Sequence, residues 1–186
     1  MATKKKEIKT EYPLPAYNYR LTILPGSFQE IPAGTELMEK LGAVSVISCS
    51  EVSGLSLEVE TTIYKHGFSF LTGFQVIPGQ SKEVRLSIKK GVTTNGNYFS
   101  DWIGLVYPFV MPLPLGFARK RDILVDLCDE KGDAVVRWTV IKALPTRLDA
   151  PTFDATTNEV AFEKMDFIAH QLRVEYLNSN DILPFV

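Results

Sequence analysis

Two histidines are the side chains best suited to acid–base catalysis, and any Ser-His-Asp arrangement in this chain must use one of them. Neither His66 nor His170 lies in a recognisable catalytic signature, so surface or packing roles are the simpler interpretation. A nucleophile elbow requires Gly-x-Ser-x-Gly, and the nearest approach, Ser53-Gly54, lacks the flanking glycine spacing. We therefore expect no enzymatic activity and no catalytic residue.

Metal and phosphate ligands are equally sparse. The thiol and imidazole side chains that a zinc ion would use are Cys49, His66, Cys128 and His170. No two of them have the close spacing of structural zinc sites. The segment 91–96 superficially resembles a phosphate loop, but Asn97-Tyr98 stands where Lys-Ser/Thr is required. We expect buried thiols and no bound metal, nucleotide or other cofactor.

Four carboxylates gather in one short segment: Asp126, Asp129, Glu130 and Asp133. The residues 129–133 also have turn chemistry, because Gly132 is free to take a positive φ. Alternating apolar residues on both sides, over 123–128 and 136–140, predict a β-hairpin with this turn at its tip. Charge at a hairpin tip is normally solvated, and we prefer this interpretation to a calcium or acid–base site.

The elements that would position these residues are mainly strands. Besides the hairpin, we expect strands over 17–24, 44–52 and 84–89, and a long extended run over 159–175 whose apolar parity switches, which predicts a bulge or a sharp bend. A helix is expected over 98–106, capped by Asn97 and stopped by Pro108. The Pro- and Gly-rich segments 25–43 and 73–81 are expected to be loops, with a short helical turn at 37–41 as an alternative within the first. These elements predict a mainly β domain, a β-barrel or a sandwich of two packed antiparallel sheets with one flanking α-helix.

The clearest alternation runs from Leu55 to Tyr64. One face would hold Leu55, Leu57, Val59, Thr61 and Ile63, and the other Ser56, Glu58, Glu60, Thr62 and Tyr64. We expect the apolar face to lie in the core, and the polar face to meet either solvent or an assembly or channel. The uncharged loop from 107 to 117 poses a similar choice, between packing across its own barrel and docking on another subunit. Its candidate contact residues are Tyr107, Phe109, Met111, Leu113, Leu115 and Phe117.

Composition fits one globular domain. The 186 residues are 45% hydrophobic and 23% charged, which excludes a disordered chain. The formal net charge of -2 provides no overall cationic field for nucleic acid or anionic lipid. Residues 1–11 are basic without a following apolar stretch, and we expect a flexible tail there and not a secretion signal. The apolar stretch 102–118 is too short and too rich in proline to span a bilayer, so we expect no membrane insertion.

Several stretches in fixed order carry a family resemblance. They are 12–20 (Tyr12-Pro-Leu-Pro-Ala-Tyr-Asn-Tyr-Arg20), 50–60, 88–92 followed by 98–102, 121–133, 136–138 and 158–161. From about residue 12 to 176 the chain resembles the inner tail tube proteins of contractile phages and of phage tail-like contractile injection systems. The loops 25–43 and 108–116 depart from the shorter members of that family. A single domain over 12–177 and a C-terminal extension over 178–186, which either joins an assembly or frays, complete the expected organisation.

The resemblance implies a structural role. Six copies would form a ring, and stacked rings would form a hollow tube inside a contractile sheath, in contact with baseplate and tail-terminator proteins. Protein effectors or DNA would pass through the lumen, toward which Ser56, Glu58, Glu60 and Thr62 are candidates to face. Such a chain would be synthesised in the bacterial cytoplasm and assembled into a phage tail or injection particle. The alternatives are a secreted hexameric ring protein of type VI secretion type that carries effectors, and a small-molecule-binding β-barrel.

Overall fold

The computed structural model describes residues 13–25, 44–67, 71, 73–94, 98–106, 120–156 and 158–177. Over these ranges the elements are β1 (Tyr19–Ile23), β2 (Ser45–Ile47), β3 (Glu51–Ser53), β4 (Val59–Tyr64), β5 (Gln75–Ser81), β6 (Val84–Gly91), α3 (Tyr98–Val106), β7 (Arg121–Cys128), β8 (Ala134–Asp149), β9 (Phe162–Ala169) and β10 (Gln171–Tyr176). The expected tail 1–11, the extension 178–186, the loop 107–117 and nearly all of the loop 25–43 lie outside the described residues.

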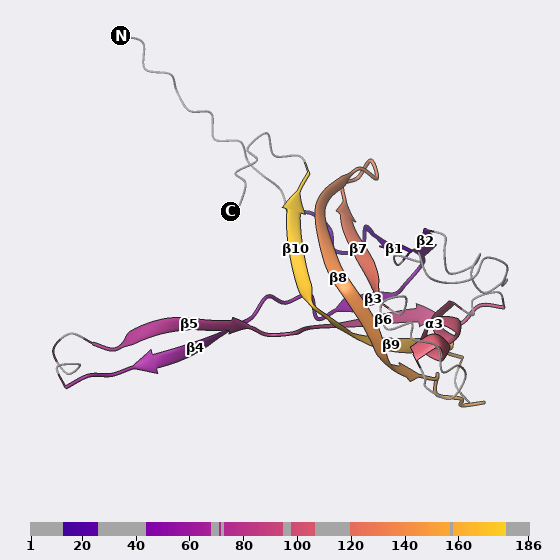
Figure 1. The fold of residues 1–186 in the computed structure, drawn as a ribbon. Helices are drawn as coiled ribbons and strands as arrows, with labels where there is room; N and C mark the ends of the chain where they lie inside the picture. The colour runs from indigo at the N-terminus through magenta and orange to yellow at the C-terminus, as the bar shows by residue number, and fades with distance from the viewer. Residues whose placement is uncertain are drawn as a thin grey trace, which may run out of the picture.

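One long strand organises the body of the molecule. The eight-stranded antiparallel sheet has the order β2-β1-β7-β8-β9-β6-β3, and β10 also pairs with β8. The first part of β8, up to Ile141, lies between β7 and β10, whereas its last part, from Leu144, pairs with β9. Figure 1 shows β8 curving through the body from one group of strands to the other. The sheet therefore folds at β8 into two halves that face each other.

The core fills the space between these halves. It joins Leu21 and Ile123 from one half to Ile88 and Phe167 from the other, and each of these side chains is at most 1% exposed. The helix α3 adds Trp102, whose ring lies 5.1 Å from that of Phe167. Within the described residues, the predicted mainly β fold of two packed antiparallel sheets with a flanking α-helix is confirmed.

Local predictions were confirmed where the chain folds on itself. The hairpin of β7 and β8 turns through Gly132 with φ of 88°, and α3 covers the predicted residues. The parity switch in the run 159–175 is a bend at His170, between β9 and β10. The segment 44–52 is not the single strand expected. It forms two short strands, β2 and β3, because the chain leaves one half of the sheet and enters the other at 48–50.

Two expectations for the segment 55–81 were wrong. Residues 55–58 are not a strand, and β4 begins at Val59 with both of its faces exposed instead of one face in the core. Residues 75–81, expected to be a loop, form β5 and pair with β4. Figure 1 shows this two-stranded arm, β4 and β5, extending well away from the body. No other described element covers the arm, so alternation alone could not produce a buried face.

Within the described residues, no helix has the length and apolar character needed to cross a membrane.

Candidate assembly interface

The four polar candidates from the sequence all lie on the arm or at its base. Ser56 and Glu58 precede β4, Glu60 and Thr62 lie within it, and all four side chains are exposed. Glu58 forms an ion pair of 3.2 Å with Lys82, on the opposite side of the arm's base. The arm brings these residues together on one ribbon, and their role in assembly stays a prediction.

The arm has one aliphatic face. Ile63 lies directly opposite Val76, so their side chains point to the same side, and Thr61 and Val59 follow on that side along β4. Val59, Ile63 and Val76 are 54%, 58% and 55% exposed. We call these three residues the aliphatic face of the arm. Leaving such surface in water forgoes about 25 cal/mol per Å² of burial, so this face favours a partner.

The opposite face of the arm is more polar. Thr62 lies opposite Ile77, and Tyr64 lies opposite Gln75. Glu60 precedes them on the same side of β4. The two-faced pattern expected for this segment is therefore present, but both faces are exposed and the apolar one is not buried in the core.

The base of the arm has a fixed backbone geometry. Gly54 follows β3 with φ of 86°, and a Cβ atom there would lie 2.0 Å from the carbonyl oxygen of Arg85 on β6. The backbone N–H of Lys82 donates to the carbonyl of Glu58 at 2.9 Å, which closes the ribbon where it leaves the body. Because Gly54 has no side chain, β3 and β6 can approach closely and direct the arm outward.

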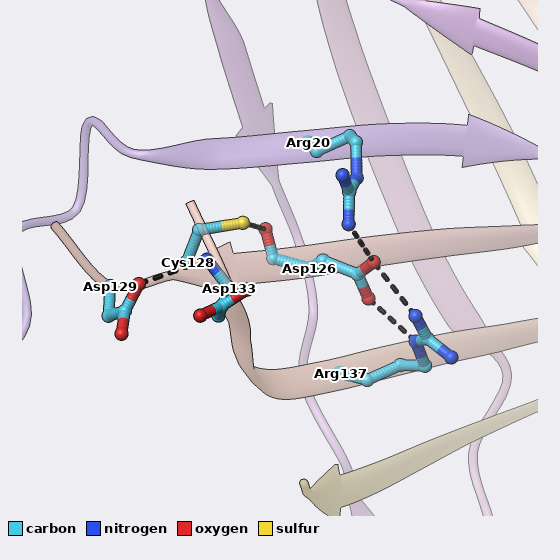
Figure 2. Close-up of polar contacts among 6 residues, drawn as sticks. All are labelled: Arg20, Asp126, Cys128, Asp129, Asp133 and Arg137. Atoms are coloured by element: carbon cyan, nitrogen blue, oxygen red, sulfur yellow. Dashed lines mark hydrogen bonds and ion pairs between the residues drawn. The ribbon is translucent and has the colours of Figure 1, made fainter. Parts of the chain in front are cut away.

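A row of alternating charge crosses the body. The register places Arg20, Asp126, Arg137 and Glu175 side by side on β1, β7, β8 and β10. Arg137 donates to both oxygens of Asp126, at 2.7 and 3.0 Å, and Arg20 approaches from the other side at 3.4 Å, as Figure 2 shows. The hydrogen bonds from Arg137, more than any other cause, lower the pKa of Asp126.

The expectation of a solvated carboxylate is wrong for Asp126. Its side chain is 3% exposed, and the side chains of Arg20 and Arg137 on the two neighbouring strands lie against it. Asp129 is also engaged, since it accepts the backbone N–H groups of Lys131 and Asp133 at 2.9 Å each and stabilises the turn. Glu130 and Asp133 are exposed at the tip, as expected.

The residues considered for metal binding or catalysis lie apart in the chain's described part. His66 follows β4 on the arm, and His170 lies exposed at the bend between β9 and β10. Cys49 and Cys128 are free thiols, and burial raises the pKa of Cys49. Across the described ranges, no three His, Cys, Asp or Glu residues are grouped so as to hold a metal ion.

Comparisons with known proteins agree with this architecture. A family model described as T4-like virus tail tube protein gp19 matches residues 18–173. Among curated protein sequences there is no significant match. A chain from the cryo-EM structure of the anti-feeding prophage cap, the tube-terminating cap, is 27% identical with a TM-score of 0.70, over 95% of this chain and 99% of that one.

Two further structures extend the comparison. A chain from the PVC sheath–tube complex, an extracellular contractile injection system in the extended state, is 26% identical with a TM-score of 0.68, over 95% of this chain and 100% of that one. A chain from the anti-feeding prophage baseplate shares the fold, with a TM-score of 0.71 at 18% identity over 91% of this chain and 100% of that one. The match over 18–173 confirms the resemblance seen in the sequence. The chain therefore belongs to the T4-like virus tail tube protein gp19 family and is a structural component of a tail tube.

Proposed function

We propose that six copies of this chain form a ring, and that stacked rings form the hollow inner tube of a contractile particle. The observation that carries this proposal is the arm, whose aliphatic face has no partner among the described residues of its own chain. A neighbouring copy would bury Val59, Ile63 and Val76, while the opposite face with Glu60 and Thr62 would stay in water at the lumen. The role is mechanical and involves no catalytic step.

The structures that contain the relatives support a proposal for the partners of this chain. The similar chains come from structures of a tube-terminating cap, a sheath–tube complex and a baseplate. We infer that this chain likewise contacts a contractile sheath along the tube, a terminator at one end and a baseplate at the other. Protein effectors or DNA would pass through the lumen. Synthesis in the bacterial cytoplasm would precede assembly into the phage tail or injection particle.

The aliphatic face provides a direct test. Ile63→Glu places a charge in the proposed buried contact, whereas Thr62→Glu places the same charge on the adjacent, water-facing side of β4. Sedimentation velocity and negative-stain electron microscopy of the purified chains should show rings and tubes for the wild type and for Thr62→Glu. Ile63→Glu should remain monomeric, because burying an unpaired carboxylate is costly. Normal assembly of Ile63→Glu would contradict the proposal, and rings that never stack would favour the secreted effector carrier.

A further inference from the structure

A basic pocket lies where the arm, the bend at His170 and the start of β7 meet. It has a volume of about 450 Å³, and its charged lining residues are Lys82, Glu83, Lys120 and Lys142, with His170 beside them. Glu83 binds the guanidinium of Arg85 at 2.8 Å, and Lys82 pairs with Glu58. No carboxylate among the described residues forms an ion pair with Lys120 or Lys142. The pocket therefore holds an excess of positive charge.

Lys142 occupies this pocket at a cost in backbone energy. It is the one non-glycine residue of the described ranges with a positive φ, 55°, and it lies in a bulge of β8 opposite the start of β7. Its backbone N–H donates to Asp122 at 2.8 Å, which holds the bulge in place. A left-handed conformation costs an L-residue about 1–2 kcal/mol. The bulge thus carries a lysine that lines the pocket together with Lys120.

The opposite end of the same strand pair is acidic. The turn between β7 and β8 holds three carboxylates, Asp129, Glu130 and Asp133, against one ammonium, Lys131. Asp129 is committed to the turn, but Glu130 and Asp133 are exposed. Neither forms an ion pair with a described lysine or arginine. The carboxylates of Glu130 and Asp133 are therefore accessible to a positively charged partner.

The two charged ends are held at a fixed separation. Lys120 precedes β7 and the acidic turn follows it, so the eight residues of β7 separate them by about 25 Å at the usual strand rise. Figure 1 shows the turn at one end of the β7–β8 pair, away from the junction with the arm. Unlike ends on one rigid element suit a head-to-tail contact between identical copies. Such a contact continues as an open stack when the rotation between copies does not close it into a ring.

We propose that the acidic turn of one copy, through Glu130 and Asp133, docks into the pocket with Lys120 and Lys142 of the next copy along the tube. This inference rests on the proposed tube and assigns the contact between successive rings. The complementary charges, which belong to the same chain, identify a second copy as the occupant. The aliphatic face of the arm would then hold subunits together by burial, while this contact would set the stacking direction.

Charge reversal tests the contact. The tip variant Glu130→Lys/Asp133→Lys and the pocket variant Lys120→Glu/Lys142→Glu should each form rings but few tubes. A loss of about tenfold or more in tube mass is expected, because like charges face each other. The variant with all four substitutions should regain tubes, since the two charges are exchanged. Lys89→Glu, at an exposed site outside both the pocket and the turn, is the matched control that should form tubes.

Each outcome has a distinct meaning. Wild-type tubes should separate into rings as NaCl rises from about 0.1 to 1 M, because the screening length falls from about 10 to 3 Å. Normal tubes from the tip and pocket variants, or no recovery in the fourfold variant, would overturn the contact and leave the proposed tube intact. Normal tubes combined with loss of sheath binding by the pocket variant would assign the pocket to the sheath instead. A wild-type chain that forms neither rings nor tubes would refute the proposed function itself.

Discussion

Asp126 is buried between two arginines, and its removal should be costly. In Asp126→Asn the side chain keeps its shape but loses the charge that Arg137 and Arg20 bind at 2.7 to 3.4 Å. We expect the free energy of unfolding to fall by about 2–3 kcal/mol, measured by urea denaturation of the monomer. Glu159→Gln, at an exposed site, is the control and should change it by less than about 0.5 kcal/mol. Equal effects of the two substitutions would contradict the role given to Asp126.

The same carboxylate predicts a pH dependence. Because the pKa of Asp126 is lowered in the folded state, the unfolded chain binds the proton more readily. Its contribution to stability is therefore complete above the unfolded value of about 3.9 and is lost as the pH falls toward the folded value. The difference in unfolding free energy between wild type and Asp126→Asn should be constant from pH 7 to 5 and shrink below pH 4. If this difference in unfolding free energy instead grew as the pH fell, the pKa of Asp126 would not be lowered in the folded state.

At the residue level, the sequence indicates whether a side chain is buried better than it indicates which side chain it contacts. Alternation correctly separated the two faces of β6, where Val84, Leu86 and Ile88 are buried. It could not reveal that Asp126, also in an alternating strand, would be enclosed, because that depends on arginines from strands 106 and 11 residues away. Burial of a charge is decided by what lies across the sheet, and register is a tertiary property.

At the level of elements, Gly54 controls how the arm leaves the body. Gly54→Ala adds a Cβ atom 2.0 Å from the Arg85 carbonyl and must keep a φ of 86°. We expect a loss of about 2–4 kcal/mol in unfolding free energy, and a redirected arm that assembles poorly. Gly91→Ala is the matched control on β6, because an added Cβ there meets nothing within 4 Å. Thermal melting of both variants measures the difference in stability. Equal melting temperatures would contradict the role given to Gly54.

At Lys142 in the bulge of β8, a change to glycine should not destabilise the fold, in contrast to the loss of glycine at Gly54. Lys142→Gly removes the left-handed strain and should leave stability unchanged or raise it by up to about 1 kcal/mol. Lys142→Val should lower it by about 1–2 kcal/mol, because a β-branched residue tolerates positive φ poorly. Chemical denaturation of the two variants measures the difference. Identical stabilities would mean that the bulge relaxes to an ordinary strand when the side chain changes.

The arm is the element that the sequence predicted least well. Pro78 and Gly79 make the segment 73–81 look like a loop, and both residues are depleted in strands. They are accommodated because the pairing of β4 and β5 has an irregularity beside them, on a ribbon whose outer edges are unpaired within the described chain. The alternation over 55–64 indicated two faces, but no pattern within one chain distinguishes burial in its own core from burial against a copy.

At the scale of the whole molecule, the body and the arm should be separable. None of the buried core residues lies between positions 48 and 83 in the described chain, while β3 and β6 already pair as neighbours. The arm is thus an outward extension of the β3–β6 hairpin. The two strands of this hairpin pair with each other in the body, through residues outside the arm. A molecule divided in this way would use its body for folding and its arm for association.

Deleting the arm tests this division. In a variant with residues 57–81 replaced by Asn-Gly, which favours tight hairpin turns, the new turn and the remaining residues 54–56 and 82–83 would connect β3 to β6. We expect a folded monomer with an unchanged near-ultraviolet signal from the buried Trp102, and no rings or tubes at concentrations where the intact chain assembles. Circular dichroism and sedimentation velocity measure the two properties independently. An unfolded product would show that the arm stabilises the body, and persistent assembly would place the main subunit contact elsewhere, because only the removed ribbon carries the aliphatic face formed by Val59, Ile63 and Val76.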